Sequence, residues 1–102
     1  MDRQELRVLL ISSAEGWIAQ CLDYDICAQG SSEDEVKLRF ALTVEADLAE
    51  SIDRHGEPFK GIDPAPSSFH ALWGEAEVAN QPVSVDGVSG KLDIQYGHQI
   101  AA

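Results

Sequence analysis

Basic residues, cysteines and long hydrophobic runs are all scarce in this sequence, and each shortage argues against a class of protein. Seven lysines and arginines stand against eighteen aspartates and glutamates, which gives a net charge of −11 at pH 7. Affinity for a phosphate backbone comes from lysine and arginine displacing counterions, so we expect no direct binding to nucleic acid. An acidic surface suits a basic protein partner, although acidity also keeps a small protein soluble.

No segment of the sequence has the composition of a membrane span or a secretory signal. The apolar run at residues 6–11 contains Arg7 and follows acidic residues, so it is too short and too charged for a signal peptide. A membrane span needs roughly 20 apolar residues. Cys21 and Cys27 are the only cysteines, and without a second pair they predict no metal site. We expect a cytoplasmic protein with free thiols and no cofactor, a Cys21–Cys27 disulfide being the alternative.

The length of 102 residues fits a single domain. Apolar residues make up 44% of the chain, which is enough for a hydrophobic core. A domain of this size buries only about two-thirds of its unfolded surface. Association into a homodimer or a higher homo-oligomer would add stability, and we expect it here.

The first half of the sequence predicts three strands that lead into a helix. Residues 6–11 are β-prone and largely apolar, which is typical of a central strand, and residues 17–22 and 26–29 predict two more. Between the last two lies the corner Asp23–Asp25, where aspartate favours turn geometry. Gly30 then permits the change of backbone direction into the helix.

A capped helix of about 22 residues, roughly 33 Å long, follows this glycine. Ser32 with Glu35 three residues later matches a capping box, and acidic residues fill the first turn. Gly56 ends the pattern. Apolar residues recur every four positions, at Val36, Phe40, Val44, Leu48 and Ile52. Leu38 and Leu42 widen this stripe, either as further core or as a subunit contact.

The second half predicts a loop and further strands. Prolines and glycines mark residues 57–68 as a loop. Residues 75–85 predict a strand broken at Pro82, and turn signals at 86–90 lead to an alternating, half-buried strand over 92–100. Three large side chains between the loop and these strands are expected to join the core: Phe69, Leu72 and Trp73.

Few residues point to chemistry, and each has a structural explanation. Asp23 and Asp25 would share one side of an extended chain, as a paired-carboxylate metal or acid site requires, but this spacing at a corner is more often turn chemistry. An anion at Gly30 before the helix would be repelled by the acidic first turn. The histidines lie far apart and pair with no cysteine at metal-ligand spacing: His55, His70 and His98.

The corner also carries the candidate partner-binding residues. Tyr24 at the turn is an aromatic side chain of the kind that anchors interfaces, and Trp17 is a second, with core packing as its alternative. With the flanking carboxylates, the candidate set is Trp17, Asp23, Tyr24 and Asp25.

The order of these pieces resembles the HicB-like antitoxin domain family. The resemblance is carried by 16–19, by 22–30, and by Ser32, Glu35 and Val36. These are similar to the family's glycine–aromatic–x–alanine strand, its aspartate-containing corner and its glutamine–glycine entry into a capped helix. The positions of the fold motif are Gly16, Gly30, Ser32 and Glu35. The resemblance covers residues 6–56, about half of the chain.

The resemblance implies an α+β fold of the partial ribonuclease H-like kind, β-β-β-α-β, with one long helix packed on one face of the sheet and extra C-terminal strands. Residues 1–102 would then form one domain, with a core at 1–56, a loop at 57–68 and a β-rich extension at 69–102. Family members lack the catalytic carboxylates of ribonuclease H, and the typical member neutralises HicA, a small basic toxin that cleaves mRNA.

The function that the resemblance implies is therefore non-catalytic binding of a small basic protein. The sequence departs from the family pattern at Ser31-Ser32 and at Asp25-Ile26, and its C-terminal half contains no helix pair typical of DNA binding. Two alternatives stay open. One is a stand-alone oligomeric structural or ligand-binding protein of the same fold, and the other is a metal-dependent nuclease, which requires three or more clustered carboxylates.

Overall fold

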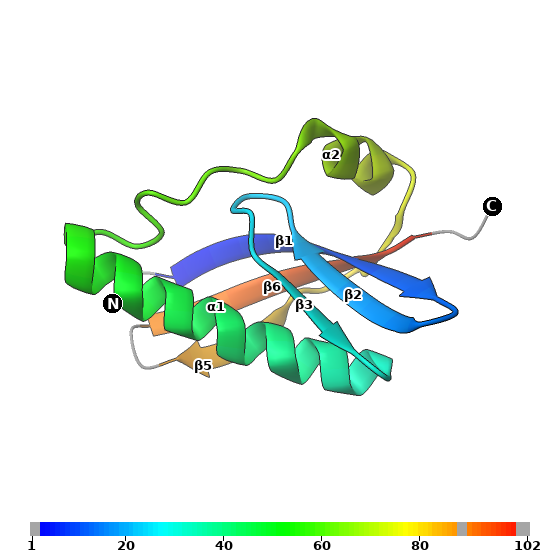
Figure 1. The fold of residues 1–102 in the computed structure, drawn as a ribbon, viewed down its shortest axis with the longest axis horizontal. Helices are drawn as coiled ribbons and strands as arrows, with labels where there is room; N and C mark the ends of the chain where they lie inside the picture. Colours follow the sequence, from blue (N-terminus) through cyan, green and yellow to red (C-terminus); the bar gives the residue numbers. More distant parts are fainter. Residues whose placement is uncertain (1–2, 88–89, 100–102) are drawn as a thin grey trace.

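A computed structural model describes residues 3–87 and 90–99, and within them the chain is an α+β domain with a mixed sheet of six strands and two helices, one of them long (Figure 1). In chain order the elements are β1 Arg3–Ser13, β2 Gly16–Cys21, β3 Cys27–Gly30, α1 Glu33–His55, α2 Ser67–Gly74, β4 Glu77–Val78, β5 Val83–Gly87 and β6 Gly90–His98.

The sheet is organised around β1, which lies between β2 and β6. The strand order is β3-β2-β1-β6-β4, and β5 also pairs with β6. β1 and β6 run parallel, with Leu6 beside Ile94 and Val8 beside Tyr96, whereas the other described pairings are antiparallel. The predicted central strand and the two strands after it are confirmed, and the C-terminal strands extend the same sheet.

The main core lies between one face of the sheet and α1. Side chains alternate along a strand, so Leu6, Val8 and Leu10 of β1 point to this face together with every second residue of β6. The predicted stripe of α1 packs against them. Its four members at Val36, Phe40, Val44 and Leu48 are at most 2% exposed, and Ile52 packs at the edge of the cluster. We call this the α1 face.

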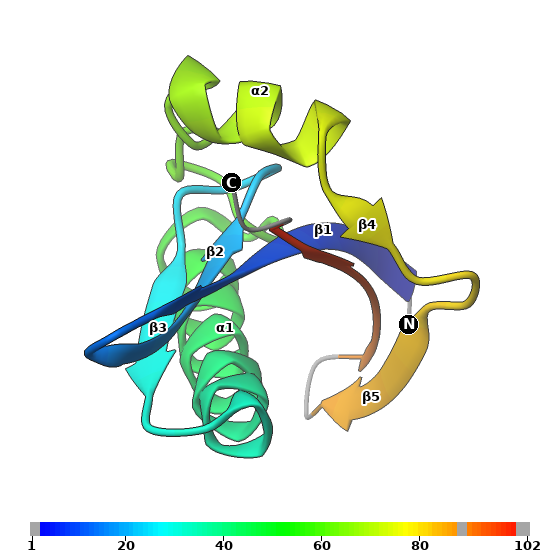
Figure 2. The same cartoon turned by 90° about the vertical axis from the view of Figure 1, so that its right-hand side faces the viewer.

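The opposite face, which we call the outer face, is covered by α2 over one end of the sheet (Figure 2). Trp73 of α2 packs against Gly97 of β6 so closely that a Cβ on Gly97 would lie 2.5 Å from the Trp73 ring. Leu9 of β1, on this face, is fully buried. Burial on both faces explains why β1 carries consecutive apolar residues from Val8 to Ile11.

The structure corrects the expectations for the second half of the chain in two places. The aromatic segment after the loop is a helix, α2, and its residues Phe69, Leu72 and Trp73 are half-buried on the outer face and do not join the core under α1. Phe59, inside the predicted loop, is a core residue with 2% exposure. Its backbone φ of 61° is unusual for a side chain of this size, so the buried ring offsets a local strain.

The alternation predicted for residues 92–100 is also only partly right. Leu92, Ile94 and Tyr96 are buried as expected, but Asp93 on the other face is buried too, with 6% exposure. Ile100 and Ser89, which belong to this predicted strand and to the turn before it, lie outside the described residues. The strand break at Pro82 is confirmed, because β4 ends at Val78 and β5 begins at Val83.

Leu38 and Leu42 are not part of the core. Their exposed fractions are 62% and 61%, because they lie on the side of α1 that faces away from the sheet. The expectation that they extend the core is wrong, and a subunit contact through them stays a prediction.

At the N-terminus of α1, Ser32 caps the helix as the sequence predicts, but the Glu35 side chain bonds a different residue from the one expected. Ser32 is the N-cap, and its hydroxyl accepts a hydrogen bond from the Glu35 backbone N–H at 3.1 Å. In a capping box the Glu35 carboxylate would accept from the same serine's N–H, but it accepts from the N–H of Ser31, at 2.8 Å. At the other end, Gly56 has a φ of 75° and donates to the Ile52 carbonyl, which confirms the predicted stop.

Gly30 is needed for a close approach, not for a special backbone angle. A Cβ on Gly30 would lie 2.7 Å from the backbone nitrogen of Val36, in the first turn of α1. The neighbouring Gly16 has a φ of 131°, and its Cβ would meet the Gly30 carbonyl oxygen at 2.6 Å. The two motif glycines therefore allow β2, β3 and the start of α1 to pack backbone against backbone.

We expect Gly30→Ala to destabilise the fold by roughly 1–3 kcal/mol, because the added methyl group meets backbone that cannot move aside cheaply. Gly74→Ala is the matched control, since a Cβ there has no neighbour within 4 Å, and it should be neutral or stabilise by roughly 0.4–1 kcal/mol. Urea unfolding followed by circular dichroism measures both. Equal midpoints for the two variants would contradict the close packing of Gly30.

Candidate functional site

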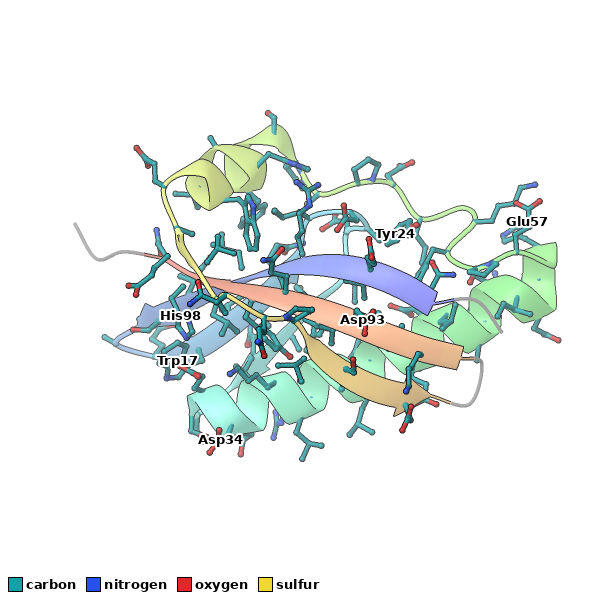
Figure 3. All side chains as sticks on the ribbon, turned by 180° about the vertical axis from the view of Figure 1, so that it is seen from behind. Trp17, Tyr24, Asp34, Glu57, Asp93 and His98 are labelled. Carbon is teal, nitrogen blue, oxygen red and sulfur yellow. The ribbon has the colours of Figure 1, made fainter. Side chains whose placement is uncertain are left out.

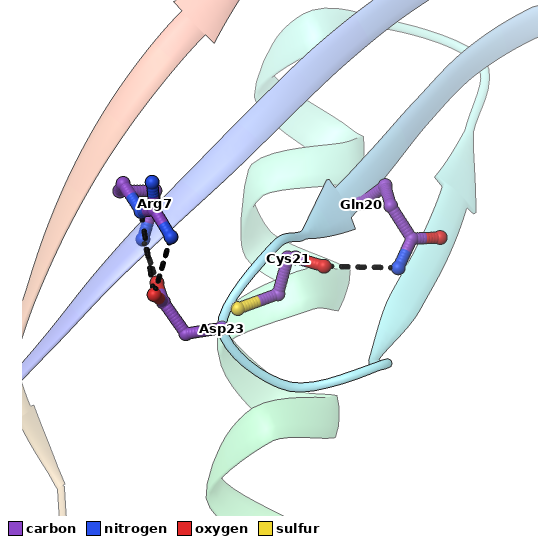
Figure 4. Close-up of polar contacts among 4 residues, drawn as sticks. All are labelled: Arg7, Gln20, Cys21 and Asp23. Carbon is purple, nitrogen blue, oxygen red and sulfur yellow. Dashed lines mark hydrogen bonds and ion pairs between the residues drawn. The ribbon is translucent and has the colours of Figure 1, made fainter. Parts of the chain in front are cut away.

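The predicted corner at residues 23–25 is tied into the fold mainly through Asp23 (Figure 4). Its carboxylate accepts hydrogen bonds from the Arg7 backbone N–H at 2.9 Å and from the Arg7 Nη2 at 2.9 Å. The Arg7 Nε donates to the same oxygen as Nη2, at 3.3 Å. Asp23 therefore fixes the corner to β1 and satisfies a backbone donor.

Asp25 turns to a different partner. It accepts a hydrogen bond at 3.0 Å from the side-chain nitrogen of Gln20, which also donates to the Cys21 carbonyl. The two aspartates thus serve separate contacts and do not converge on one point. Across residues 3–87 and 90–99, no three histidine, cysteine or acidic side chains are grouped as a metal site would need.

Tyr24 is used for internal packing. Its ring stacks on the buried Phe59 with 4.3 Å between ring centroids and 19° between planes. The loop that carries Phe59 is held against the corner by two backbone hydrogen bonds, from Asp25 N–H to the Asp63 carbonyl and from Ala65 N–H to the Leu22 carbonyl. The face of the Tyr24 ring is therefore occupied by Phe59 and is not available to a partner.

Trp17 lies at the other end of β2 from the corner, so the structure does not bring the four candidate residues together (Figure 3). It packs at the edge of the core and stands edge-on to His98, with ring centroids 6.4 Å apart. His98 on β6 hydrogen-bonds Glu33 of α1 at 2.9 Å. Trp17 and His98 thereby join β2, β6 and the first turn of α1.

Glu33 is the electrostatic centre of that junction. Two hydrogen bonds hold the pKa of the Glu33 carboxyl below its usual value. The larger effect comes from Lys37 and the smaller one from His98. Lys37 also lies over the Tyr96 ring, 4.7 Å from its centroid. The aromatic and charged groups at this end of the sheet are therefore engaged with one another.

The cysteines are both free thiols. Cys21 points into the core, where burial raises the pKa of its thiol, whereas Cys27 on β3 is exposed. Because Cys27 pairs with Gln20 across the strands, Cys21 and Cys27 face opposite sides of the sheet. The alternative of a disulfide is wrong for this arrangement.

A feature that the sequence prediction missed is a cavity of about 360 Å³ on the outer face, beyond the end that α2 covers. Asp23 is its link to the predicted corner, and Asp93 lies on β6 between β1 and β5 (Figure 3). Its lining consists of Glu5, Leu6, Arg7, Asp23, Pro82, Asp93 and Gln95. Glu5 and Asp93 were visible in the sequence, but only the parallel register of β1 with β6 places them at neighbouring positions of the sheet.

Comparison with known proteins adds no relative: no protein-family model, no curated protein and no solved structure matches the chain. Within the described ranges, neither helix has the length and apolar character needed to cross a membrane. The fold and the geometry of the site are therefore the basis for any functional conclusion.

We expect Asp23→Ala to destabilise the domain by about 1–3 kcal/mol, because it leaves the Arg7 backbone N–H without its acceptor. Asp25→Ala is the control, because Asp25 is exposed and Gln20 keeps its bond to the Cys21 carbonyl. Its effect should stay within about 0.5 kcal/mol. Thermal unfolding of both variants measures the difference, and similar losses would contradict the structural role assigned to Asp23.

Glu33→Gln should lower the urea midpoint at pH 7 and have little effect in strong acid. The pKa of Glu33 is lower in the folded chain than in the unfolded chain, where it is about 4.3. Its charge therefore stabilises the fold above that pH, and the stabilisation is lost as the pH falls through the lower, folded pKa.

The control for this pH dependence is Asp34→Asn, in the same turn of α1 but exposed. It removes the same charge without touching Lys37 or His98. A difference between the two variants that persists unchanged from pH 7 to below the folded pKa would contradict the assignment.

Proposed function

We propose that this chain is a non-catalytic, HicB-like interaction domain that binds and neutralises a small basic protein, such as a HicA-type mRNA-cleaving toxin. The observation that carries the proposal is the topology together with the motif. Three antiparallel strands are followed by Gly30, by the capping residue Ser32 and by one long helix. A later strand, β6, pairs parallel with the first. The order of the first four elements agrees with the β-β-β-α-β order that the resemblance to the HicB-like family implies, with α2, β4 and β5 inserted before the last strand.

The distribution of charge supports a basic partner. Every lysine and arginine whose side chain the structure describes forms an ion pair with a nearby carboxylate of the same chain: Arg7, Lys37, Arg39, Arg54, Lys60 and Lys91. Cations that are already paired offer little attraction to phosphate, while the excess of carboxylates creates a negative field. Complementary charge of this kind speeds encounter with a basic protein and selects against acidic ones.

The separate partners of Asp23 and Asp25 give no support to the nuclease alternative at the corner. Metal-assisted hydrolysis would need several carboxylates aimed at one point. In the proposed function these side chains contribute to binding through their shape and charge, and they catalyse no reaction.

A stand-alone oligomer is the second candidate, and the exposure of Leu38 and Leu42 favours it. They lie one helical turn apart on the free side of α1, where a second copy could cover them. The two candidates are compatible in an antitoxin that also associates.

The test of the antitoxin function is co-expression with the products of the neighbouring genes. We expect a small basic protein to co-purify with this chain and its RNA cleavage to stop in the complex. If no small basic product of an adjacent gene binds, the antitoxin function is wrong.

The oligomer is tested by light scattering of the wild type and of Leu38→Glu/Leu42→Glu. We expect the mass of the wild type to be a multiple of 11.1 kDa and the double variant to be a monomer, because two charges would be buried in the contact. Ala46→Glu/Ala49→Glu, which also adds two exposed charges to α1, shows how far the contact extends along the helix. A monomeric wild type would rule out this contact.

A further inference from the structure

The two faces of the sheet are covered unequally. α1 runs along the α1 face, whereas α2 covers only the end of the outer face near Gly97 (Figure 2). On β1 the boundary falls within a few residues, since Leu9 is fully buried while Arg7 is partly exposed and Glu5 is exposed. No described helix covers the outer face at Glu5 and Arg7, and the cavity of about 360 Å³ opens there.

The parallel register decides which groups meet in this cavity. Glu5 pairs with Asp93, and Arg7 pairs with Gln95, all on the outer face. Neighbouring strands lie about 4.8 Å apart, so the side chains of Glu5 and Asp93 leave the sheet at adjacent positions on the same face. Asp23 joins them from the corner, bonded to Arg7. Among the residues that the structure describes, three carboxylates and one guanidinium thus line the cavity, and the formal charge of this described lining is negative.

Hydrogen bonds hold two of the three carboxylates in place. Asp93 is 6% exposed and accepts a hydrogen bond from the Ser84 hydroxyl of β5 at 2.6 Å. Asp23 is fixed by three contacts with Arg7. Glu5 is exposed and makes no hydrogen bond or ion pair with the side chains that the structure describes, so its carboxylate is accessible to an incoming cation. Carboxylates held in place bind a cation without the cost of ordering them first.

We propose that the uncovered half of the outer face is the docking surface for a basic segment of a partner protein, with one arginine or lysine side chain seated in the cavity between Glu5, Asp23 and Asp93. The inference rests on the proposed function, because it names the surface through which a basic partner would be held. It moves the contact from the tip of the corner, where Tyr24 is engaged with Phe59, to the sheet face beside it.

The shape and composition of the cavity fit such a side chain. Its volume lies at the lower end of the range for small-ligand sites, about 300–1,000 Å³. Pro82 supplies an apolar wall for the methylene stem of a basic side chain, and the carboxylates receive its charged end. A guanidinium can bond two neighbouring carboxylates at once, which suits the pairing of Glu5 with Asp93.

The test uses nona-arginine as the probe and the whole chain, labelled with ¹⁵N for amide NMR. The titration is done in roughly 0.15 M salt, where screening over about 8 Å suppresses the general field of an acidic protein. We expect the largest shift changes at the backbone amides of Arg7, Asp93 and Gln95. Shift changes spread evenly over the acids of α1 would overturn the proposal.

Two pairs of variants separate the cavity from overall charge. Glu5→Gln should weaken nona-arginine binding roughly fivefold or more, because it removes a carboxylate from the cavity. Asp53→Asn removes the same charge from the exposed side of α1 and should change the affinity less than about twofold.

Gln95→Lys places a cation in the cavity and should block the peptide. Gln29→Lys adds the same charge on β3 and should not. Equal effects within either pair would overturn the proposal.

The failures of the docking surface and of the antitoxin function can be told apart. If a basic partner co-purifies equally well with Glu5→Gln, Gln95→Lys and the wild type, the docking surface is wrong and the proposed function stands. If nona-arginine binds in the cavity but no adjacent gene encodes a basic partner, the chemistry of the surface stands and the antitoxin function falls.

Discussion

The parallel pairing of β1 with β6 is the constraint on which the rest of this structure depends. Parallel neighbours cannot be joined by a tight turn, and here most of the chain lies between the two strands. The hairpin, α1, the loop and α2 must all be placed so that β6 returns beside β1. That return closes the core over α1, and it also sets Glu5 beside Asp93 on the outer face. One register therefore determines both the stability of the domain and the composition of its cavity.

The loop between the helices is the second determinant, and it works through a few strong contacts. Phe59 has a left-handed backbone conformation, and its ring is buried in the core. The Tyr24 ring stacks on it. The Phe59 N–H donates to the hydroxyl of the buried Ser51 in α1 at 2.7 Å, so the strained residue leaves no buried donor unpaired. Burial of the Phe59 ring offsets the backbone strain at this residue. Through the stacking of Tyr24 on Phe59, the corner at residues 23–25 packs against the interior of the domain.

The sequence predicted the elements whose signals are local. The Ser32 cap, the Gly56 stop and the four-residue apolar period of α1 each depend on neighbours along the chain, and each is where it was expected. Gly30 was predicted to matter for a local reason, whereas its role is contact with Val36 across the turn. α2 was missed because its short pattern follows a proline-rich loop and lacks a side-chain cap.

The candidate site was harder to predict because it depends on contacts that are distant in the sequence. Asp23 and Asp25 are near neighbours along the chain, yet Arg7 and Gln20 draw them to different places. Glu5 and Asp93 are far apart along the chain, yet the register makes them adjacent. Spacing along the chain therefore predicted a paired site at Asp23 and Asp25 that the fold does not form. It gave no sign that Glu5 and Asp93 would be neighbours.

The position of the acids has a consequence for how such a domain can select a partner. Along α1 and the loop, acidic side chains alternate with lysine and arginine in exposed pairs such as Glu50 with Arg54, and pairs of this kind contribute little and are screened by salt. On the outer face, Asp93 is buried and Asp23 is half-buried, and salt screens buried or partly buried charges less than exposed ones. A basic segment that arrives through the general field would be held more strongly there than on the helix. Attraction and retention would then reside on different parts of one surface, the first set by net charge and the second by the β1–β6 register.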